Sequence, residues 1–330
     1  MKNYNIALVG CGKISFNHLT AISKLPEINV AALCDIKPER AEARNSEFGL
    51  SAKIYTDYYE MLKSEKLDAV HIATPHYLHA PMTLAALERD IYVCLEKPMC
   101  ISTEEITELI EAEKKSRAKV AVSFQTRYNK ANMIAKRIAE EDGMVSAYCS
   151  LFWQRTNEYY TESGWRGAYS TEGGGVMINQ AIHSIDHLIS ICGKPVAVTA
   201  TTSNHKHKGI IEVEDTCEGM VEFENGIFGN FFATNAFRGD SKTTLFFKTA
   251  NHELEIRNSK LYIDDKLAED TETAGYLGKE VYGDGHLTFI KKFYEAIEDA
   301  TEMPITLESA QWPLRLLLAA YKSNDERVLV

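Results

Sequence analysis

A glycine turn between an apolar strand and a helix, near the start of the chain, limits most strongly what this sequence can fold into. Residues 5–9 lead into the turn Gly10-Cys11-Gly12-Lys13-Ile14-Ser15, and a segment able to begin a helix follows it. A strand, a glycine turn and a helix in this order place backbone N–H groups and the positive end of a helix dipole where a pyrophosphate can bind. The turn therefore predicts a dinucleotide site whose phosphate-binding residues are Gly10, Cys11, Gly12, Lys13 and Ile14.

An acidic residue at a suitable distance strengthens this prediction. Twenty residues after Ser15, the apolar run 30–34 ends in Asp35. A carboxylate there accepts hydrogen bonds from the ribose hydroxyls of an adenosine and repels a 2′-phosphate, which favours NAD over NADP. Lys37 lies close enough in the sequence to leave NADP open, and the alternative role for Asp35 is a cap at the end of a strand.

Length, charge and cysteine usage narrow the class of protein. The chain has 330 residues, which suits two domains. Its formal net charge of −11 argues against nucleic acid and against an anionic membrane surface as partners. No run approaches the roughly 20 apolar residues of a membrane span, and the first residues show no apolar leader, so no signal peptide is expected. Seven cysteines without a CxxC pair are typical of reduced thiols in a cytoplasmic protein.

Strands and helices alternate in the first part of the chain. Apolar strands are expected at residues 5–10, 28–34, 53–55, 69–74, 91–95 and 119–123. Helices between them are expected near 14–24, 38–48, 57–64, 77–89 and 103–117. Because short apolar strands that alternate with helices build a doubly wound parallel sheet, we expect an α/β dinucleotide-binding domain over residues 1–123.

Strands dominate after residue 123. They are expected at 145–153, 196–203, 216–224, 227–237, 243–250, 253–257 and 260–264, with helices near 129–141, 176–192, 285–300 and 306–322. The turn Glu224-Asn225-Gly226 between two alternating runs indicates a hairpin. These strands predict a second α/β domain, residues 124–330, with a large, mostly antiparallel sheet that is open on one face. Pro313 is expected to kink the last helix or to mark its true start.

Two clusters of residues are candidates for the chemistry. Glu96-Lys97-Pro98 ends the fifth strand, at the carboxyl edge where open α/β sheets bind their ligands. In the second half, three glycines at 173–175 allow a close approach of the backbone and precede a helical run. On that helix Asn179, His183 and Asp186 are spaced to share one face.

Three motifs now stand in order along the chain: the glycine turn at 10–15, Glu96-Lys97-Pro98, and the three glycines followed by the helix of His183 and Asp186. In this order and at these separations, they resemble the motifs of the Gfo/Idh/MocA oxidoreductases, the family of glucose–fructose oxidoreductase and inositol dehydrogenase. The likeness covers essentially the whole chain and includes residues 73–79 and Trp165-Arg166-Gly167. It implies an N-terminal Rossmann domain and a C-terminal α/β domain whose open sheet commonly forms the oligomer interface. It also implies NAD(P)-dependent oxidation or reduction of a sugar, cyclitol or related polyol, and nucleotide-linked sugars are substrates in some branches.

The resemblance assigns roles to residues of this chain. It makes Lys97 and His183 the catalytic pair. The further cofactor contacts expected are Thr74, Pro75, His79, Glu96, Lys97, Trp165 and Arg166. The substrate contacts expected are Lys97, Gln125, Arg127, Asn179 and His183. Structural roles stay open for Gln125 and Arg127, and also for Tyr282 and His286, two further candidates for lining the pocket.

Elementary chemistry agrees with the catalytic pair. Oxidation of a carbinol carbon requires a group that takes the hydroxyl proton and has a pKa near the working pH. His183 suits this task because an imidazole has an ordinary pKa of about 6.5. Lys97 starts near about 10.4 and is better suited to orient and polarise the reacting hydroxyl. Asn179 stands where many members of the family carry aspartate, which weakens the case for inositol but not for redox chemistry.

Two alternative functions are compatible with this sequence. An NAD-dependent glycosidase would oxidise a sugar transiently, eliminate a glycoside and reduce the product, whereas a nucleotide-sensing regulator would bind NAD without turnover. His183 and His187 are four residues apart, but no third ligand accompanies them in the sequence, so no metal is expected. The resemblance implies a homodimer or homotetramer through the second sheet. Four aromatic residues of that sheet invite such pairing but could equally cover helices of the same chain, namely Phe228, Phe231, Phe246 and Phe247.

Overall fold

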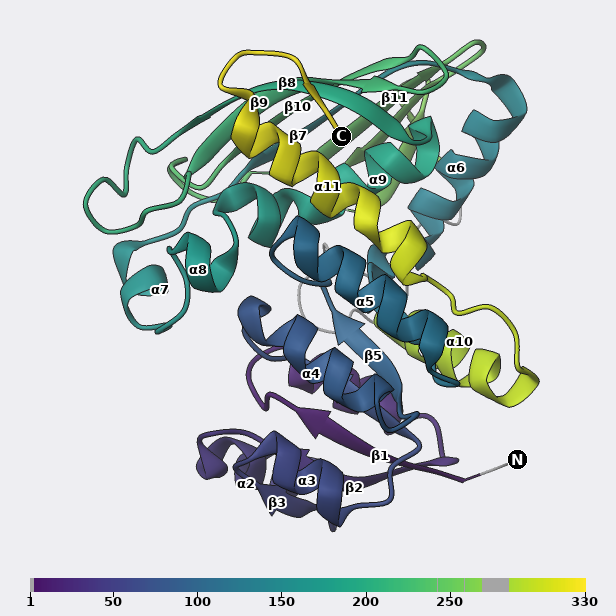
Figure 1. The fold of residues 1–330 in the computed structure, drawn as a ribbon. Coiled ribbons are helices and arrows are strands. Elements are labelled where there is room, and N and C mark those ends of the chain that lie inside the picture. Colours follow the sequence, from purple (N-terminus) through teal and green to yellow (C-terminus); the bar gives the residue numbers. More distant parts are fainter. Residues whose placement is uncertain (1–2, 242, 258, 269–284) are drawn as a thin grey trace. The chain divides into compact units, whose positions relative to one another are not determined.

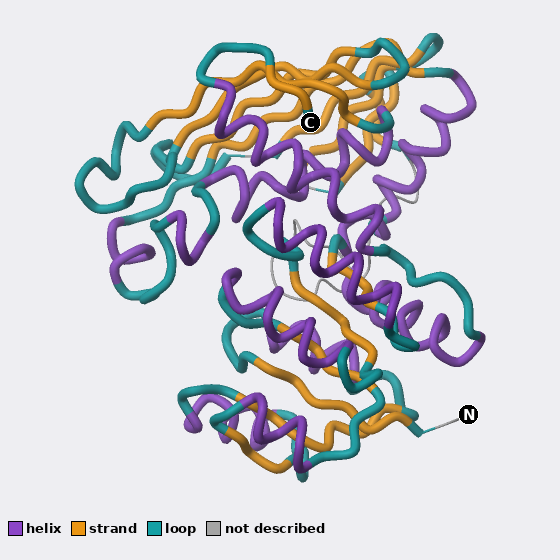
Figure 2. Tube along the Cα trace, in the orientation of Figure 1, coloured by secondary structure: helices purple, strands orange, loops and turns teal. Residues whose placement is uncertain are grey.

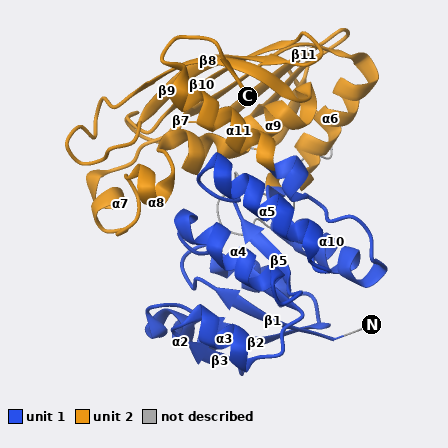
Figure 3. Ribbon diagram, in the orientation of Figure 1, with its two compact units in different colours: residues 1–125, 285–310 blue, residues 126–284, 311–330 orange. Residues whose placement is uncertain are grey.

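The computed structural model describes residues 3–241, 243–257, 259–268 and 285–330 (Figure 1). The chain divides into two compact units, one of residues 1–125 with 285–310 and one of residues 126–284 with 311–330 (Figure 3). Among the described residues, no helix combines the length and the apolar character that crossing a lipid bilayer requires.

The first unit is built on a six-stranded sheet in the order β3-β2-β1-β4-β5-β6. Its strands are β1 (Tyr4–Val9), β2 (Ile28–Cys34), β3 (Lys53–Tyr55), β4 (Ala69–Ile72), β5 (Tyr92–Glu96) and β6 (Val120–Ser123). Every neighbouring pair is parallel. The order reverses between β1 and β4, and this switch point is where doubly wound sheets bind dinucleotides. The predicted doubly wound parallel sheet is confirmed.

The helices of this unit are α1 (Ser15–Ile22), α2 (Pro38–Glu47), α3 (Tyr58–Ser64), α4 (His79–Leu87), α5 (Thr103–Lys115) and α10 (Gly285–Asp299), with a 3₁₀ turn η1 at His76–Leu78. Two helices of this unit, α3 and α5, begin at side-chain caps that the sequence supplies, Asp57 and Ser102. At the start of α5 the hydroxyl of Ser102 accepts from the Glu105 N–H at 3.1 Å, and the Glu105 carboxylate accepts from the Ile101 N–H at 2.9 Å. These paired bonds satisfy backbone donors that the first helical turn leaves unpaired.

Helix α10 belongs to the first unit, although it lies outside the range 1–123 that the sequence suggested for that domain. It packs against α1 and β6, and its residues Phe289 and Phe293 are fully buried. The sequence pattern shows that this helix is amphipathic but does not say which sheet receives its apolar face.

The second unit is built on a nine-stranded sheet in the order β14-β13-β12-β11-β7-β10-β9-β8-β15. Its strands are β7 (Met144–Phe152), β8 (Pro195–Ser203), β9 (Thr216–Phe223), β10 (Phe228–Thr234), β11 (Thr244–Thr249), β12 (Glu253–Arg257), β13 (Lys260–Ile263), β14 (Lys266–Leu267) and β15 (Val328–Leu329). The β9–β10 hairpin is antiparallel as expected, while β7 and β10 pair in parallel. The sheet is therefore mostly antiparallel, which confirms the predicted class.

Helices of the second unit gather on one face of this sheet (Figure 2). They are α6 (Lys130–Asp142), α7 (Asn157–Thr161), α8 (Tyr169–Glu172), α9 (Ile182–Cys192) and most of α11 (Leu307–Ser323), with a 3₁₀ turn η2 at Gln125–Tyr128. Helix α9 packs on β7 and β11, and α6 packs on β11, β12 and β13.

Two local features differ from the sequence expectations. The helix expected at 176–192 begins with a π-helical turn, η3 (Met177–Ala181), before it continues as α9. Pro313 lies inside α11, six residues after its first residue Leu307, and therefore does not mark the start of the helix. A π-turn holds one residue more than an α-turn, and side-chain spacing alone does not reveal it.

Candidate functional site

The glycine turn of the first unit leaves the backbone open to a ligand. Gly10 has φ +87°, its N–H donates to the Cys34 carbonyl at 2.8 Å, and a Cβ there would overlap the carbonyl of Ala73. At Gly12 no heavy atom lies within 4 Å of where a Cβ would stand. A side chain at Gly12 would fill space that is otherwise open beside the start of α1. The turn therefore fits a pyrophosphate at a helix N-terminus.

Asp35 lies beside this turn, as a ribose ligand requires. Its carboxylate accepts from the N–H of Cys11 at 2.8 Å and from the N–H of Lys37 at 2.9 Å. Each carboxylate oxygen has a second lone pair, so these bonds leave acceptor capacity for ribose hydroxyls. Burial and the charge of Asp35 raise the pKa of the Cys11 thiol to about 12, and Cys11 therefore stays uncharged beside the cofactor turn.

Arg44 on α2 braces the same turn, a contact that the sequence did not predict. Its Nη2 donates to the Gly12 carbonyl at 3.1 Å and its Nε donates to the Ser15 hydroxyl at 3.0 Å. Lys13 is exposed and Ile14 is partly exposed. No spacing rule connects residue 44 with residue 12, so only the fold reveals this contact.

The loops after β4 and β5 are tied together by His79. Its Nε2 lies 2.9 Å from the Thr74 carbonyl and its Nδ1 lies 2.6 Å from the Pro98 carbonyl. Burial lowers the pKa of His79, against the opposing effect of these two carbonyls. The residues expected at this edge lie around the carboxyl ends of the adjacent strands β4 and β5, namely Thr74, Pro75, His79, Glu96 and Lys97.

Glu96 is the last residue of β5 and directly precedes Lys97. Its Oε1 accepts from His18 Nε2 at 3.0 Å, and it lies 4.0 Å from His286 Nε2. Burial favours the protonated acid, but the hydrogen bond from His18 and the neighbouring positive charges lower the pKa of Glu96 to about 2. Glu96 is therefore a buried carboxylate, whereas Lys97 beside it is partly exposed.

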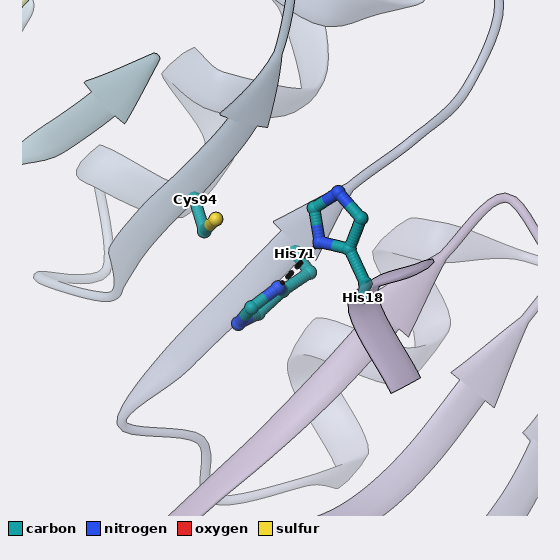
Figure 4. A group of neighbouring side chains, drawn as sticks. All are labelled: His18, His71 and Cys94. Atoms are coloured by element: carbon teal, nitrogen blue, oxygen red, sulfur yellow. Dashed lines mark hydrogen bonds between the residues drawn. The ribbon is translucent and has the colours of Figure 1, made fainter. Parts of the chain in front are cut away.

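One buried cluster of the described residues has the composition of a metal site. One ring nitrogen each of His18 and His71 and the Sγ of Cys94 lie within 4.8 Å of one another, and two imidazoles with a thiolate suit zinc or copper (Figure 4). The two Nδ1 atoms, however, are 2.8 Å apart and hydrogen-bonded. Burial, together with the charge of Glu96, raises the pKa of the Cys94 thiol well above its ordinary value. The cluster therefore fits a hydrogen-bonded network better than a metal centre.

In the second unit, three glycines bring the backbone close to Glu214 and Tyr321. A Cβ at Gly174 would overlap the Tyr321 ring, and one at Gly175 would overlap the Glu214 carbonyl. The Glu214 carboxylate accepts from the N–H groups of Gly175 at 2.8 Å and Met177 at 3.0 Å. Burial raises the pKa of Glu214 to about 7, against these hydrogen bonds. The glycines thus place the start of η3 on a buried carboxyl group, which explains the predicted close approach.

The π-turn carries two neighbouring amides that enter a polar network. The Asn179 amide donates to the carboxylate of Glu172, which also accepts from the Gly167 N–H at 2.6 Å. The amide of Gln180 donates to the Tyr159 hydroxyl at 3.0 Å. Its carbonyl accepts from Asn235 at 2.9 Å. Both amides are therefore oriented by partners that the sequence pattern did not indicate.

His183 and Asp186 occupy the first turns of α9. Nδ1 of His183 lies 3.4 Å from the Thr126 hydroxyl. Asp186 is fully buried and accepts from Arg127 Nε at 2.7 Å and from its Nη2. Burial raises the pKa of Asp186, and the charge of Arg127 opposes that rise. Arg127, expected near the substrate, thus anchors α9 to the segment that carries Thr126.

The remaining expected site residues lie in two further places. The Arg166 guanidinium lies 4.5 Å from the ring centroid of Trp165 and 4.5 Å from that of Tyr159. Gln125 is buried, and its Oε1 accepts from the Ser123 hydroxyl at 3.5 Å. His286 is fully buried in the first unit, and Tyr282 lies outside the described residues.

Comparison with known proteins agrees with this architecture. Residues 4–124 match the oxidoreductase family with an NAD-binding Rossmann fold, and residues 140–260 match the GFO/IDH/MocA C-terminal domain. Inositol 2-dehydrogenase of Salmonella typhimurium is 32% identical over 135 residues, which span 40% of this chain and only 40% of that enzyme. Levoglucosan dehydrogenase of Pseudarthrobacter phenanthrenivorans is 26% identical over 278 residues, covering 74% and 71% of the two chains.

A solved structure matches along the entire chain. The WlbA dehydrogenase of Chromobacterium violaceum, crystallised with NADH and UDP-GlcNAcA, has a TM-score of 0.88 and 26% identity. The match covers 100% of this chain and 96% of that one. The two halves of the chain thus match the two domains of one family in the same order. The chain therefore belongs to the Gfo/Idh/MocA family of oxidoreductases, and its first unit carries the family's NAD-binding Rossmann fold.

Proposed function

We propose that this protein transfers a hydride between NAD and a carbinol carbon of a carbohydrate-like small molecule. The observation that carries the proposal is the carboxyl edge of the first sheet. There the open space at Gly12, the carboxylate of Asp35 and the residue Lys97 belong to one compact unit. This arrangement supplies a phosphate cradle, a ribose acceptor and a cation at the sheet edge that binds ligands in this class of fold.

The cofactor would be held by the residues of that edge. The backbone N–H groups of residues 12–14 would face the pyrophosphate, since those of Gly10 and Cys11 donate to Cys34 and Asp35, and Asp35 would accept from the adenosine ribose. When bound, the nicotinamide supplies the hydride chemistry that amino-acid side chains lack. Because the Asp35 carboxylate is fixed by the N–H groups of Cys11 and Lys37, it would repel a 2′-phosphate and favour NAD over NADP.

Lys97 and His183 would handle the proton of the reacting hydroxyl. We assign His183 as the acid/base, with Thr126 orienting its ring from 3.4 Å, and Lys97 as the cation that polarises the hydroxyl and stabilises a developing alkoxide. Support comes from the surroundings of each residue in its own unit and from the motifs that the family shares. Asn179 would bind a further hydroxyl of the substrate, because an amide both donates and accepts hydrogen bonds.

The proposed substrate class follows from the names of the relatives and from the amide of Asn179. The relatives described above are named for inositol and levoglucosan, and the WlbA structure holds a nucleotide-linked sugar acid. All three ligands are rich in hydroxyl groups. We therefore propose a sugar, cyclitol or nucleotide sugar as the substrate of this chain.

A panel assay tests the proposal. Sugars, cyclitols and nucleotide sugars are incubated with protein and NAD or NADH while nicotinamide absorbance is followed. At least one compound should be turned over, and Lys97→Ala and His183→Ala should each lower kcat about 10²- to 10⁴-fold. Matched controls are Lys115→Ala and His205→Ala, which remove an exposed lysine and an exposed histidine. Wild-type activity in either catalytic variant would contradict the assignment.

The same panel separates the other interpretations. Release of an aglycone from a glycoside without accumulation of NADH would indicate a transient oxidation and elimination. Tight binding of NADH without turnover of any compound would indicate a nucleotide sensor. Either outcome would replace the proposed net dehydrogenase reaction.

We also propose that the protein is a homodimer or homotetramer joined through the open face of the second sheet. Large apolar side chains of neighbouring strands are exposed there, namely Tyr148, Met220 and Phe228. Phe246 stacks on Tyr148 at 5.0 Å between centroids, while Phe231 and Phe247 face the core. A hollow of about 330 Å³ on the same face is lined by Phe152, Phe232 and Phe237 among others. Exposed apolar faces of this kind are typical of protein interfaces.

Light scattering after size exclusion tests the interface. Phe228→Glu should lower the molar mass towards that of the 37.1 kDa chain, because a carboxylate on a buried interface is costly. Met133→Glu, at an exposed apolar residue on α6, is the control and should leave the mass unchanged. A monomeric wild type would contradict this proposal.

A reducing, cytoplasmic location is proposed from the cysteines. All seven are free and buried. Thiol titration in denaturant should find seven free thiols per chain in protein isolated without reductant. A lower count would indicate disulfides and an oxidising compartment.

A further inference from the structure

A chain of buried hydrogen bonds links four elements of the first unit. The Tyr294 hydroxyl on α10 lies 2.7 Å from Nε2 of His71 on β4. Nδ1 of His71 lies 2.8 Å from Nδ1 of His18 on α1 (Figure 4). Nε2 of His18 lies 3.0 Å from Oε1 of Glu96 at the end of β5. All four side chains are buried, with exposures from 0% to 6%.

The protons in this chain have one consistent arrangement for uncharged rings. Glu96 is ionised and only accepts, so His18 must donate from Nε2 and accept at Nδ1. His71 must then donate from Nδ1, and its Nε2 must accept from the Tyr294 hydroxyl. The tautomers of both histidines are thereby determined, and every bond points towards the carboxylate.

The ionised state of Glu96 agrees with this direction. Burial alone would raise the pKa of the Glu96 acid, but the hydrogen bond from His18 and the charge of Lys97 oppose this rise and keep the pKa of Glu96 below its ordinary value. Burial lowers the pKa of His71 well below its ordinary value, which keeps that ring neutral. The network therefore holds one negative charge at the end of β5.

Both ends of the His18–Glu96 bond belong to the cofactor edge. His18 lies in the first turn of α1, which starts at Ser15 directly after the glycine turn. Glu96 is bonded through the backbone to Lys97. The bond therefore joins the helix of the phosphate cradle to the strand end that carries the lysine.

We infer that His18, oriented by His71 and Tyr294, is a positioning residue that fixes the Glu96–Lys97 end of β5 relative to the glycine turn. The inference deepens the proposed function, since it concerns where Lys97 is held for the reaction. Misplacement of a catalytic group by about 1 Å can lower a rate about 10²-fold. A bond between the two elements thus has a kinetic consequence even though His18 itself touches neither substrate nor cofactor in this role.

Two substitutions of His18 test whether its bond to Glu96 matters for the rate or whether the side chain only fills space. In His18→Gln the amide nitrogen stands about where Nε2 stands, so it still reaches Glu96. In His18→Asn the amide stands about where Nδ1 stands and does not reach Glu96. We expect kcat within about threefold of wild type for His18→Gln and about 10- to 100-fold lower for His18→Asn. The substrate KM and the Kd for NADH should be similar in the two variants.

The kinetic comparison has clear contrary outcomes. Equal losses in both variants, or no loss in either, would overturn the inference. His205→Asn, at an exposed histidine, is the matched control and should behave as wild type. Melting temperatures of all variants identify any that do not fold.

A second measurement needs neither substrate nor variant activity. In protein labelled with ¹⁵N-histidine, NMR at pH 7.5 should show His18 protonated only at Nε2 and His71 protonated only at Nδ1, with assignment by His18→Gln and His71→Phe. The opposite tautomers, or a stoichiometric metal on the two Nδ1 atoms, would each overturn the inference. If the compound panel shows no turnover, the proposed function fails alone, and the tautomers still decide the hydrogen-bond chain.

Discussion

Gly12 and Gly175 both lie in glycine-rich turns, yet the space beside them differs. At Gly12 no heavy atom stands within 4 Å of the place that a Cβ would take, whereas at Gly175 the Glu214 carbonyl occupies that place. Gly175 is thus required by the packing of the protein itself, whereas at Gly12 a glycine is required only by the cofactor that we propose to bind there. This difference allows the cofactor cradle to be tested without unfolding the chain.

Gly12→Ala should fold like the wild type but bind NADH more weakly. The new methyl group meets no protein atom within 4 Å, so the melting temperature should change little. It would occupy the space through which a pyrophosphate approaches the backbone, and we expect the Kd for NADH to rise at least about tenfold. Fluorescence titration measures the Kd. An unchanged Kd would show that the pyrophosphate does not lie at Gly12.

Thr126→Val should lower kcat several-fold while Thr126→Ser retains it. Valine keeps the shape but removes the hydroxyl that lies 3.4 Å from His183 Nδ1, so the ring loses its orienting bond. A positioned acid/base contributes about 10²- to 10⁴-fold in total, of which one weak orienting contact supplies a minor part. Steady-state kinetics with the substrate found in the panel measures the effect. Equal rates in the two variants would remove Thr126 from the proposed role.

Residues that repeat a local pattern were predictable, and residues that meet across the chain were not. The glycine turn, Asp35 and the cap at Ser102 all rest on spacings of a few residues or on a strand end. Three residues from distant segments were not predicted: Arg44 contacts the first glycine turn, and Glu214 and Tyr321 contact the glycines at 174 and 175. Nothing in a single sequence relates Gly174 to Tyr321, because that contact exists only after the second sheet has formed.

At the scale of elements, one buried ion pair connects α9 to the segment before α6. Asp186 is fully buried, while the side chain of Arg127 is 19% exposed. Helical spacing placed Asp186 on the predicted helix face but did not pair it with Arg127. A buried pair is costly to break because the remaining charge has no equivalent partner.

Asp186→Asn should lower the free energy of unfolding by about 3 kcal/mol or more. The loss follows from leaving the Arg127 guanidinium largely buried without its counter-charge. Glu222→Gln is the matched control, because it breaks the more exposed pair with Arg327 and should cost less than about 1 kcal/mol. Urea unfolding of both variants measures the difference. Equal costs would mean that burial does not strengthen the Arg127–Asp186 pair.

The type of each element was easier to predict than the way in which elements begin and pair. Each expected strand of the first sheet is present within two residues of its expected ends, because apolar runs fix buried strands. The π-turn η3 and the parallel pairing of β7 with β10 were not expected. Both depend on packing in the second unit, where Glu214 accepts the first N–H groups of the turn and β10 inserts between β7 and β9.

At the scale of the whole molecule, the sequence predicted two α/β parts but not where α10 belongs. The helix follows the second sheet in the chain and yet joins the first unit, in which Tyr294 and His286 lie beside β4 and β5. Amphipathic periodicity shows that one face is apolar. The periodicity says nothing about which polar residues of another element the helix will contact. For α10, those polar contacts with β4 and β5 are what place it in the first unit.

Two buried ionisable groups whose pKa values shift in opposite directions make the stability of the second unit depend on pH. Burial lowers the pKa of His187 to about 3 and raises the pKa of Glu214 to about 7. The stabilisation linked to a neutral His187 is complete above about pH 6.5 and declines as pH falls towards about 3. The contribution of Glu214 has the opposite sign, since it is complete below about pH 4.5 and is lost as pH rises towards about 7. The pH dependence of wild-type stability is the sum of the two contributions. One of the two groups must therefore be substituted before the contribution of either can be measured.

His187→Gln should be less sensitive to acid than the wild type. The Gln carbonyl can still accept from the Asn132 amide, which lies 3.1 Å from His187 Nε2, but it takes up no proton. Between pH 7.5 and pH 5, proton uptake by an unfolded histidine should cost the wild type about 2 kcal/mol, from about 1.4 kcal/mol for each pH unit below about 6.5. The difference in unfolding free energy between variant and wild type should therefore move by about that amount in favour of the variant. Urea unfolding at the two pH values measures this shift, and parallel pH dependence in the two proteins would show that His187 titrates alike when folded and unfolded.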